Sequence, residues 1–291
     1  GVDQSGNAFS ISRTNNWAAK IKEKIGTDTM IGSCSGTIHA ETACIFAAPY
    51  TDGTSLCVTD PFCPNCAKNI VEAGIRTVYI DHKGFDKDWM ERREDAFESL
   101  SLAICRKAGV AVYELRRKEE KIIAMVEPNN APVSQDSPIE DIVLEEAVSG
   151  LSFRKITAVK TEQHRGRRIA VAVARDGFGR EHLLCARACP VNGFSYTNKA
   201  ELNALVRDGD KYSLIQEPAN RILMTAARLG LRIVDGFFYC VQLPTAREQV
   251  NLVGAGITRI FVAHPERARD ESAIAAAKTL QKAGVLDVMT L

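Results

Sequence analysis

The chain has 291 residues, of which 45% are apolar, and its net charge at neutral pH is +1. This length fits two domains, each with enough apolar residues for a core, and the small net charge gives no overall attraction to nucleic acid or anionic membranes. No apolar run approaches the roughly 18 residues that a membrane span requires, and nine cysteines are typical of a reducing compartment. We therefore expect a soluble, cytoplasmic protein.

Two short motifs about 20 residues apart carry most of the chemistry. They are His39-Ala40-Glu41 and Cys63-Pro64-Asn65-Cys66. Residues three apart in the first turn of a helix face the same way, and a helix N-terminus favours the thiolate form of cysteine. One imidazole and two thiolates are a ligand set for catalytic zinc, which keeps its fourth position open. The sequence therefore predicts a Zn²⁺ site formed by His39, Cys63 and Cys66.

Glu41 is the expected proton carrier of this site. Two thiolates cancel the formal charge of zinc, so a water on the metal is acidified less than it would be by three imidazoles, and a separate base becomes useful. Two other interpretations of the motifs are weaker. A thioredoxin-like redox pair would leave His39 and Glu41 without a role, and a structural zinc site would ordinarily have a fourth cysteine or histidine ligand.

An internal repeat indicates two copies of one domain. Residues Asn69–His82 and Asn251–His264 are identical at six of 14 positions, far above the roughly one position expected from average residue usage. The repeat follows the second motif directly in the first copy. The same stretch in the second copy therefore marks where a corresponding motif would lie.

The periodicity of each copy predicts alternating strands and helices. In the first copy, 76–80 reads as a strand, 94–108 as a helix that ends at Gly109, and 110–115 as another strand. This β-α-β order predicts that the last two strands of each copy are parallel, and the fold class is α/β. The proline-rich segment 127–139 is the predicted linker. We therefore expect a catalytic domain over 1–126 and a second domain over 140–291.

The second copy lacks the chemistry of the first. In the register of the repeat, Thr245 and Glu248 replace the two cysteines, and Pro218 and Asn220 replace the histidine and the glutamate of the first motif. A rival alignment through 199–201 recovers a glutamate but no histidine. Another cluster, His182 with Cys185 and Cys189, is better explained as buried structural residues. We expect the second domain to be degenerate and to bind no zinc.

The two motifs resemble those of the zinc-dependent cytidine and deoxycytidylate deaminase superfamily, whose signature is His-x-Glu followed by Pro-Cys-x-x-Cys. The stretch Cys66–Ile75 is also similar to the helix-to-strand segment of deoxycytidylate deaminases. One departure is the order Pro61-Phe62-Cys63, where the family has proline directly before the cysteine. The resemblance implies duplicated three-layer α/β/α domains with mixed sheets, the second copy being inactive.

The resemblance also implies substrate contacts. Asn15 or Asn16 matches a family asparagine that contacts the substrate, although a turn-capping role fits equally well. The backbone N–H of Ala40 is the expected partner of the base carbonyl. In the loop 81–89, Phe85 or Trp89 would stack on a base and Lys83 or Lys87 would contact a phosphate, but a core aromatic with surface lysines is the simpler interpretation.

The expected activity is hydrolytic deamination of a cytosine nucleotide or nucleoside. In the mechanism that the resemblance implies, zinc-bound hydroxide attacks the amino-bearing carbon, Glu41 moves the proton, and ammonia leaves. Alternatives are deamination of another base (adenine or guanine, free or in RNA) and a non-enzymatic scaffold or ligand sensor on the same fold. The expected partners are small nucleotides, nucleosides or bases, rather than nucleic acid or a membrane, and a homodimer is a further arrangement that we consider.

Overall fold

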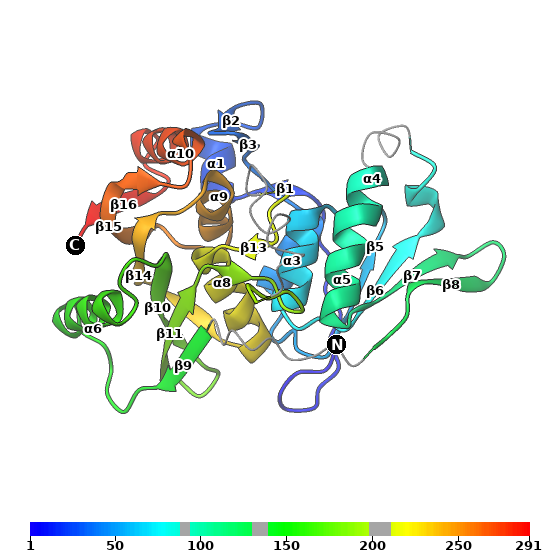
Figure 1. Ribbon diagram of the computed structural model, residues 1–291, viewed down its shortest axis with the longest axis horizontal. Coiled ribbons are helices and arrows are strands. Elements are labelled where there is room, and N and C mark those ends of the chain that lie inside the picture. The colour runs from blue at the N-terminus through cyan, green and yellow to red at the C-terminus, as the bar shows by residue number, and fades with distance from the viewer. Residues whose placement is uncertain (88–93, 130–138, 198–210) are drawn as a thin grey trace.

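The computed structural model describes residues 1–87, 94–129, 139–197 and 211–291. It is an α/β structure in which two mixed sheets, one from each half of the chain, lie on either side of a group of central helices (Figure 1). The predicted α/β class is therefore confirmed. No described helix is long and apolar enough to cross a membrane.

The sheet of the first half has four strands in the order β5-β6-β7-β8. Their bounds are Ser55–Val58, Thr77–Asp81, Ala111–Arg116 and Lys121–Val126. As predicted from the β-α-β pattern, β6 and β7 are parallel, and so are β5 and β6. The antiparallel strand β8 was not predicted. Its sequence, KIIAMV, carries exposed Ile122 and Ile123 beside charged residues, a pattern without a clear apolar face.

Helices of the first half cover one face of this sheet (Figure 1). They are α2 (Ala40–Ala47), α3 (Pro64–Glu72), and a continuous helical run of α4 (Glu94–Ala96), a π-helical turn (Phe97–Ser101) and α5 (Leu102–Ala108). The run matches the predicted helix 94–108 and ends at Gly109, whose φ of 77° suits glycine. Small elements complete this half: β1 (Asn16–Trp17), α1 (Ala19–Lys24), β2 (Met30–Ile31), β3 (Cys34–Ser35) and β4 (Thr37–Ile38).

The sheet of the second half has six strands in the order β16-β15-β14-β10-β11-β9. In this order the strands span Asp287–Thr290, Arg259–Ala268, Arg232–Leu243, Ile169–Arg175, Glu181–Arg187 and Ile139–Val143. The last two strands are parallel here as well, as predicted. The helices are α6 (Gly150–Gln163), α8 (Pro218–Leu229), α9 (Ala246–Gly254) and α10 (Glu271–Lys282). A short ribbon pairs β12 (Cys189–Pro190) with β13 (Ile215–Gln216).

The two halves differ in their layers. In the second half, α6 packs on one sheet face through Phe153, and α8 to α10 cover the other (Figure 1). In the first half, no helix among the described residues covers the outer face, where Tyr79 and Tyr113 stack with their ring centroids 5.5 Å apart. The three-layer arrangement expected of both halves is therefore seen only in the second.

A single apolar core runs through both halves. Helix α3 lies against α8 at its centre (Figure 1), where Glu72 and Arg221 form an ion pair of 2.8 Å with both side chains at most 4% exposed. Nearby, the Lys68 ammonium donates to the carbonyl of Ile215 at 3.2 Å. The contact between the halves therefore combines apolar packing with buried charge. Of the predicted linker, residues 130–138 lie outside the described part of the chain.

Candidate metal centre

The predicted metal ligands lie at the N-termini of two neighbouring helices. His39 is the N-cap residue of α2, and Cys63 is the N-cap of α3, with Pro64 in the first helical position. Proline suits that position because its missing N–H would have no helical partner there. Neither N-cap side chain bonds to the backbone of its own helix. Both side chains are therefore free of the usual capping role and are turned to each other instead.

The three donor atoms converge on one point. Nδ1 of His39 is 3.3 Å from Sγ of Cys66 and 3.6 Å from Sγ of Cys63. All three atoms lie within 4.8 Å of one another, a grouping that could hold a metal ion. One nitrogen and two sulfurs form a donor set that zinc accepts in three-ligand sites. The structure thus brings together the ligands predicted from the sequence, and the chemistry of the set fits zinc.

Hydrogen bonding and charge distribute the protons among these ligands. The hydrogen bond from Cys66, supported by His39, holds the pKa of Cys63 well below the usual thiol value. Cys66 is the donor in that hydrogen bond, and this raises the pKa of its thiol well above the usual value. The interaction with Cys63 also raises the pKa of His39. A metal ion needs deprotonated ligands, so its binding would release the proton that the two thiols share.

Glu41 is buried beside the ligands but is not one of them. Its side chain is 9% exposed, and burial, followed by the charge of Cys63, raises the pKa of its carboxyl. It lies in the first turn of α2, two residues after His39. A carboxyl group with a raised pKa exchanges protons more readily near neutral pH. The geometry therefore suits the proton carrier expected from the sequence.

Of the expected substrate contacts, Asn15 and Ala40 bond to each other. Oδ1 of the exposed Asn15 accepts a hydrogen bond of 2.8 Å from the backbone N–H of Ala40. Asn16 lies in β1, paired with Ile38 of β4. A base carbonyl that bound the Ala40 N–H would have to displace Asn15. Phe85 packs against Phe97 in the core, and Lys87 pairs with Asp60, as the simpler interpretation expected; Trp89 lies outside the described residues.

A pocket of about 540 Å³ opens beside the metal ligands. His39, Cys63 and Cys66 line it together with residues of the second half, among them Arg247 and Asn251. Sequence reasoning assigned these two residues no role. Asn251 aligns with Asn69 in the repeat and could have been found from it, since both line the pocket. Arg247 aligns with Asn65, which is uncharged, so the repeat could not predict a cation at this position.

A hydrogen bond at matching helical positions joins α2 to α3 and α8 to α9. Asn69 on α3 donates to Thr42 on α2 at 3.1 Å, and Asn251 on α9 donates in the same way to Asn220 on α8 at 2.9 Å. Thr42 is three residues after the N-cap of α2, and Asn220 three after Glu217, the N-cap of α8. By helix position, Glu217 is the counterpart of His39, whereas the alignment of the sequence repeat puts Pro218 there.

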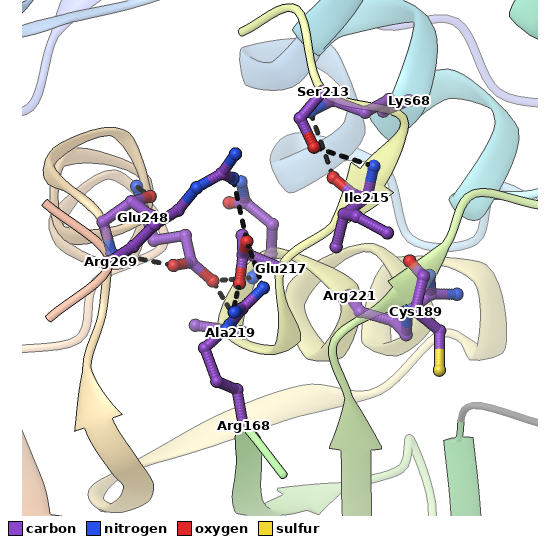
Figure 2. Close-up of polar contacts among 12 residues, drawn as sticks. Lys68, Arg168, Cys189, Ser213, Ile215, Glu217, Ala219, Arg221, Glu248 and Arg269 are labelled. Carbon is purple, nitrogen blue, oxygen red and sulfur yellow. Dashed lines mark hydrogen bonds and ion pairs between the residues drawn. The ribbon is translucent and has the colours of Figure 1, made fainter. Parts of the chain in front are cut away.

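In the second half, the N-termini of α8 and α9 meet at what we call the α8/α9 corner, where Glu217 and Glu248 are held by hydrogen bonds and ion pairs (Figure 2). The Glu248 carboxylate accepts hydrogen bonds from the backbone N–H groups of Ala219, Asn220 and Thr245, at 2.8, 3.2 and 2.8 Å. Glu217 is paired with two arginines: Arg168 contacts both of its carboxylate oxygens, at 3.0 and 2.9 Å, and Arg269 contacts one at 2.9 Å. None of the three residues at the positions of the ligands, Glu217, Thr245 and Glu248, is a histidine or a cysteine. The rival alignment through 199–201 falls outside the described residues.

One other group in the described part of the chain could hold a metal by geometry, namely Glu140, His164 and Cys185. Glu140 already accepts hydrogen bonds from Lys160 at 2.5 Å and His164 at 3.0 Å, and a lysine cation at the site opposes a second cation. The cluster considered from the sequence does not form. His182 pairs with Asp141 and lies three residues before Cys185 on β11, so the two face opposite sides of the sheet.

Comparison with known proteins gives no further assignment. No family model matches the chain, and no curated protein matches it.

Proposed function

We propose that the protein is a zinc-dependent hydrolytic deaminase of a cytosine nucleotide or nucleoside, built from two cytidine-deaminase-like domains. The convergence of His39, Cys63 and Cys66 at two helix N-termini, with Glu41 buried beside them, carries this proposal. The correspondence of α2 and α3 with α8 and α9 supports the duplication, and the α8/α9 corner at Glu248 supports an inactive second domain.

The residues divide the work between binding and proton transfer. His39, Cys63 and Cys66 would hold a zinc ion, which supplies Lewis-acid activation of water. The Glu41 carboxylate takes a proton from the attacking water and delivers it to the ring nitrogen next to the amino-bearing carbon. The water oxygen bonds to that carbon, the carbon–nitrogen bond breaks, and ammonia leaves with the second proton. The reaction needs no oxidant or reductant.

An ammonia-release screen of the zinc-loaded protein against nucleobases, nucleosides and nucleotides tests this function. We expect release from a cytosine compound. The variant Glu41→Gln should keep its zinc and its fold, because Glu41 is not a ligand, yet lose turnover by about four orders of magnitude or more. Glu248→Gln, which changes a buried carboxyl group of the second half, is the matched control and should keep near-normal turnover. Near-normal turnover by Glu41→Gln would contradict the mechanism, and no release from any cytosine compound would contradict the substrate.

A further inference from the structure

The pocket at the metal ligands is built by both halves of the chain. From the first half come the three ligands, together with Asn65 and Asn69; the second half supplies residues from α9, from the start of α10 and from the segment at 211–212. A volume of about 540 Å³ is in the range of sites that enclose a small organic ligand. Whatever reaches the metal ligands through this pocket therefore also meets side chains of the second half.

Arg247 is a cation of the second half that lines the pocket together with the three ligands. It lies in the first turn of α9, is half-buried, and donates from Nη1 to the carbonyl of Thr37 at 2.6 Å. Thr37 is two residues before His39, so this bond ties the guanidinium to the strand that leads into the metal site. The charge of Arg247 acts to lower the pKa values of both His39 and Cys66.

The charge of Arg247 is not neutralised by a carboxylate. Within the described residues, no Asp or Glu forms an ion pair with it, whereas the nearby arginines 168, 221 and 269 all have glutamate partners. Among the described residues that line the pocket, Asp270 is the one carboxylate, and it caps α10 by accepting from the N–H of Ala273 at 3.0 Å. Lys211 adds a second cation to the lining. A half-buried guanidinium without a carboxylate suits an anionic ligand group, because arginine binds phosphate oxygens in a fixed geometry.

We infer that Arg247 is a specificity residue that binds the phosphate of the substrate, so that the pocket selects nucleoside monophosphates over nucleosides and free bases. The inference deepens the proposed function and rests on it for the position of the reacting base. It also assigns a role to the second half: this half lacks the metal ligands but supplies the anion-binding group of the site in the first half.

Equilibrium binding to the full-length, zinc-loaded Glu41→Gln protein tests the inference without turnover. The probes are the four common nucleosides, their 5′-monophosphates and inorganic phosphate. We expect a monophosphate to bind at least about tenfold more tightly than its nucleoside, since the nucleoside lacks the phosphate that accepts the charge-assisted hydrogen bonds of the guanidinium. Adding Arg247→Gln should reduce this ratio to about threefold or less, and Arg247→Lys should restore part of it. Inorganic phosphate should compete with the monophosphate only when Arg247 is present.

Two controls separate a binding role from a structural one. Arg228→Gln alters another half-buried arginine that does not line the pocket, and it should leave the ratio unchanged. Zinc content and melting temperature should stay close to those of the parent in both variants, and the affinity for nucleosides should barely change in Arg247→Gln.

The outcomes distinguish this inference from the proposed function. Equal affinities for nucleoside and monophosphate, a ratio that survives in Arg247→Gln, or no binding of any monophosphate would each overturn the inference. If cytosine nucleosides are deaminated without phosphate preference, the inference fails while the proposed function stands. If a purine monophosphate shows the Arg247-dependent preference and no cytosine compound is deaminated, the inference stands while the proposed substrate is wrong.

Discussion

The N-termini of two helices meet at the α2/α3 corner, around His39 and Cys63, and again at the α8/α9 corner, around Glu217 and Thr245, but their side chains differ. In both, two helix N-termini meet, and their exposed backbone N–H groups and positive dipole ends need a partner. In the second half, Glu248 supplies this partner as a carboxylate that bonds to both helices. In the first half, His39 and Cys63 make no such bond, and Asn15 accepts from the N–H of Ala40 at the start of α2. The same meeting of helix N-termini thus holds a buried carboxylate in one half and side chains that could hold a metal ion in the other.

The largest expected effect concerns metal content. Cys63→Ala or Cys66→Ala should reduce zinc from about one per chain to near zero and abolish deamination, because two protein ligands do not retain the ion. Elemental analysis after gel filtration measures this. Cys185→Ala, which alters the other geometrically suitable group, is the matched control and should leave zinc unchanged. Two tightly bound zinc ions per chain would show that the second half has been misinterpreted.

The next effect concerns the contact between the halves. Arg221→Met leaves the buried Glu72 carboxylate without its cation, and we expect the free energy of unfolding to fall by about 3–5 kcal/mol. The double variant Glu72→Gln with Arg221→Met should lose clearly less, since no buried charge remains. Denaturant unfolding of the full chain checks both. Equal losses in the single and double variants would mean that packing, rather than charge, dominates this contact.

A smaller effect is expected at the α8/α9 corner. Glu248→Gln keeps the size of the side chain but removes the charge that binds three backbone N–H groups, and it should lower the free energy of unfolding by about 1–3 kcal/mol. Zinc content and turnover should stay near normal. Loss of zinc in this variant would be evidence that the second corner supports the first one more directly than the contacts indicate.

The smallest effect is a pH dependence at the second metal-like group. Burial raises the pKa of the Glu140 carboxyl, but hydrogen bonds from Lys160 and His164 lower it by more, so the pKa lies below its ordinary value. A lowered folded-state pKa stabilises the protein above the ordinary glutamate value of about 4.5 and loses that contribution as the pH falls through the folded value. Glu140→Gln should therefore flatten the fall in melting temperature between roughly pH 5 and 3. An unchanged slope would indicate that another carboxylate sets it.

The sequence predicted the metal site better than it predicted the pocket. His39, Cys63 and Cys66 could be found because ligand type and helical spacing are local properties. The parallel pairing of β6 with β7 and of β15 with β16 followed from periodicity for the same reason. Arg247 and Asp270 could not be placed, because they reach the pocket only through the packing of the two halves. The repeat alignment pairs His39 with Pro218 and the helix starts pair it with Glu217, since a helix start depends on capping contacts that pattern alone does not fix.

The buried contact between α3 and α8 has a consequence for how this molecule could change over time. In a symmetric dimer every substitution appears twice, so a residue that closed one metal site would close both. Here the two helix pairs belong to one chain. Position 248 can carry a carboxylate while position 66 keeps its thiol, and position 247 can carry a cation that its counterpart Asn65 lacks. Under the proposed duplication, covalent linkage removes the symmetry constraint, and each half can carry different side chains at matching positions.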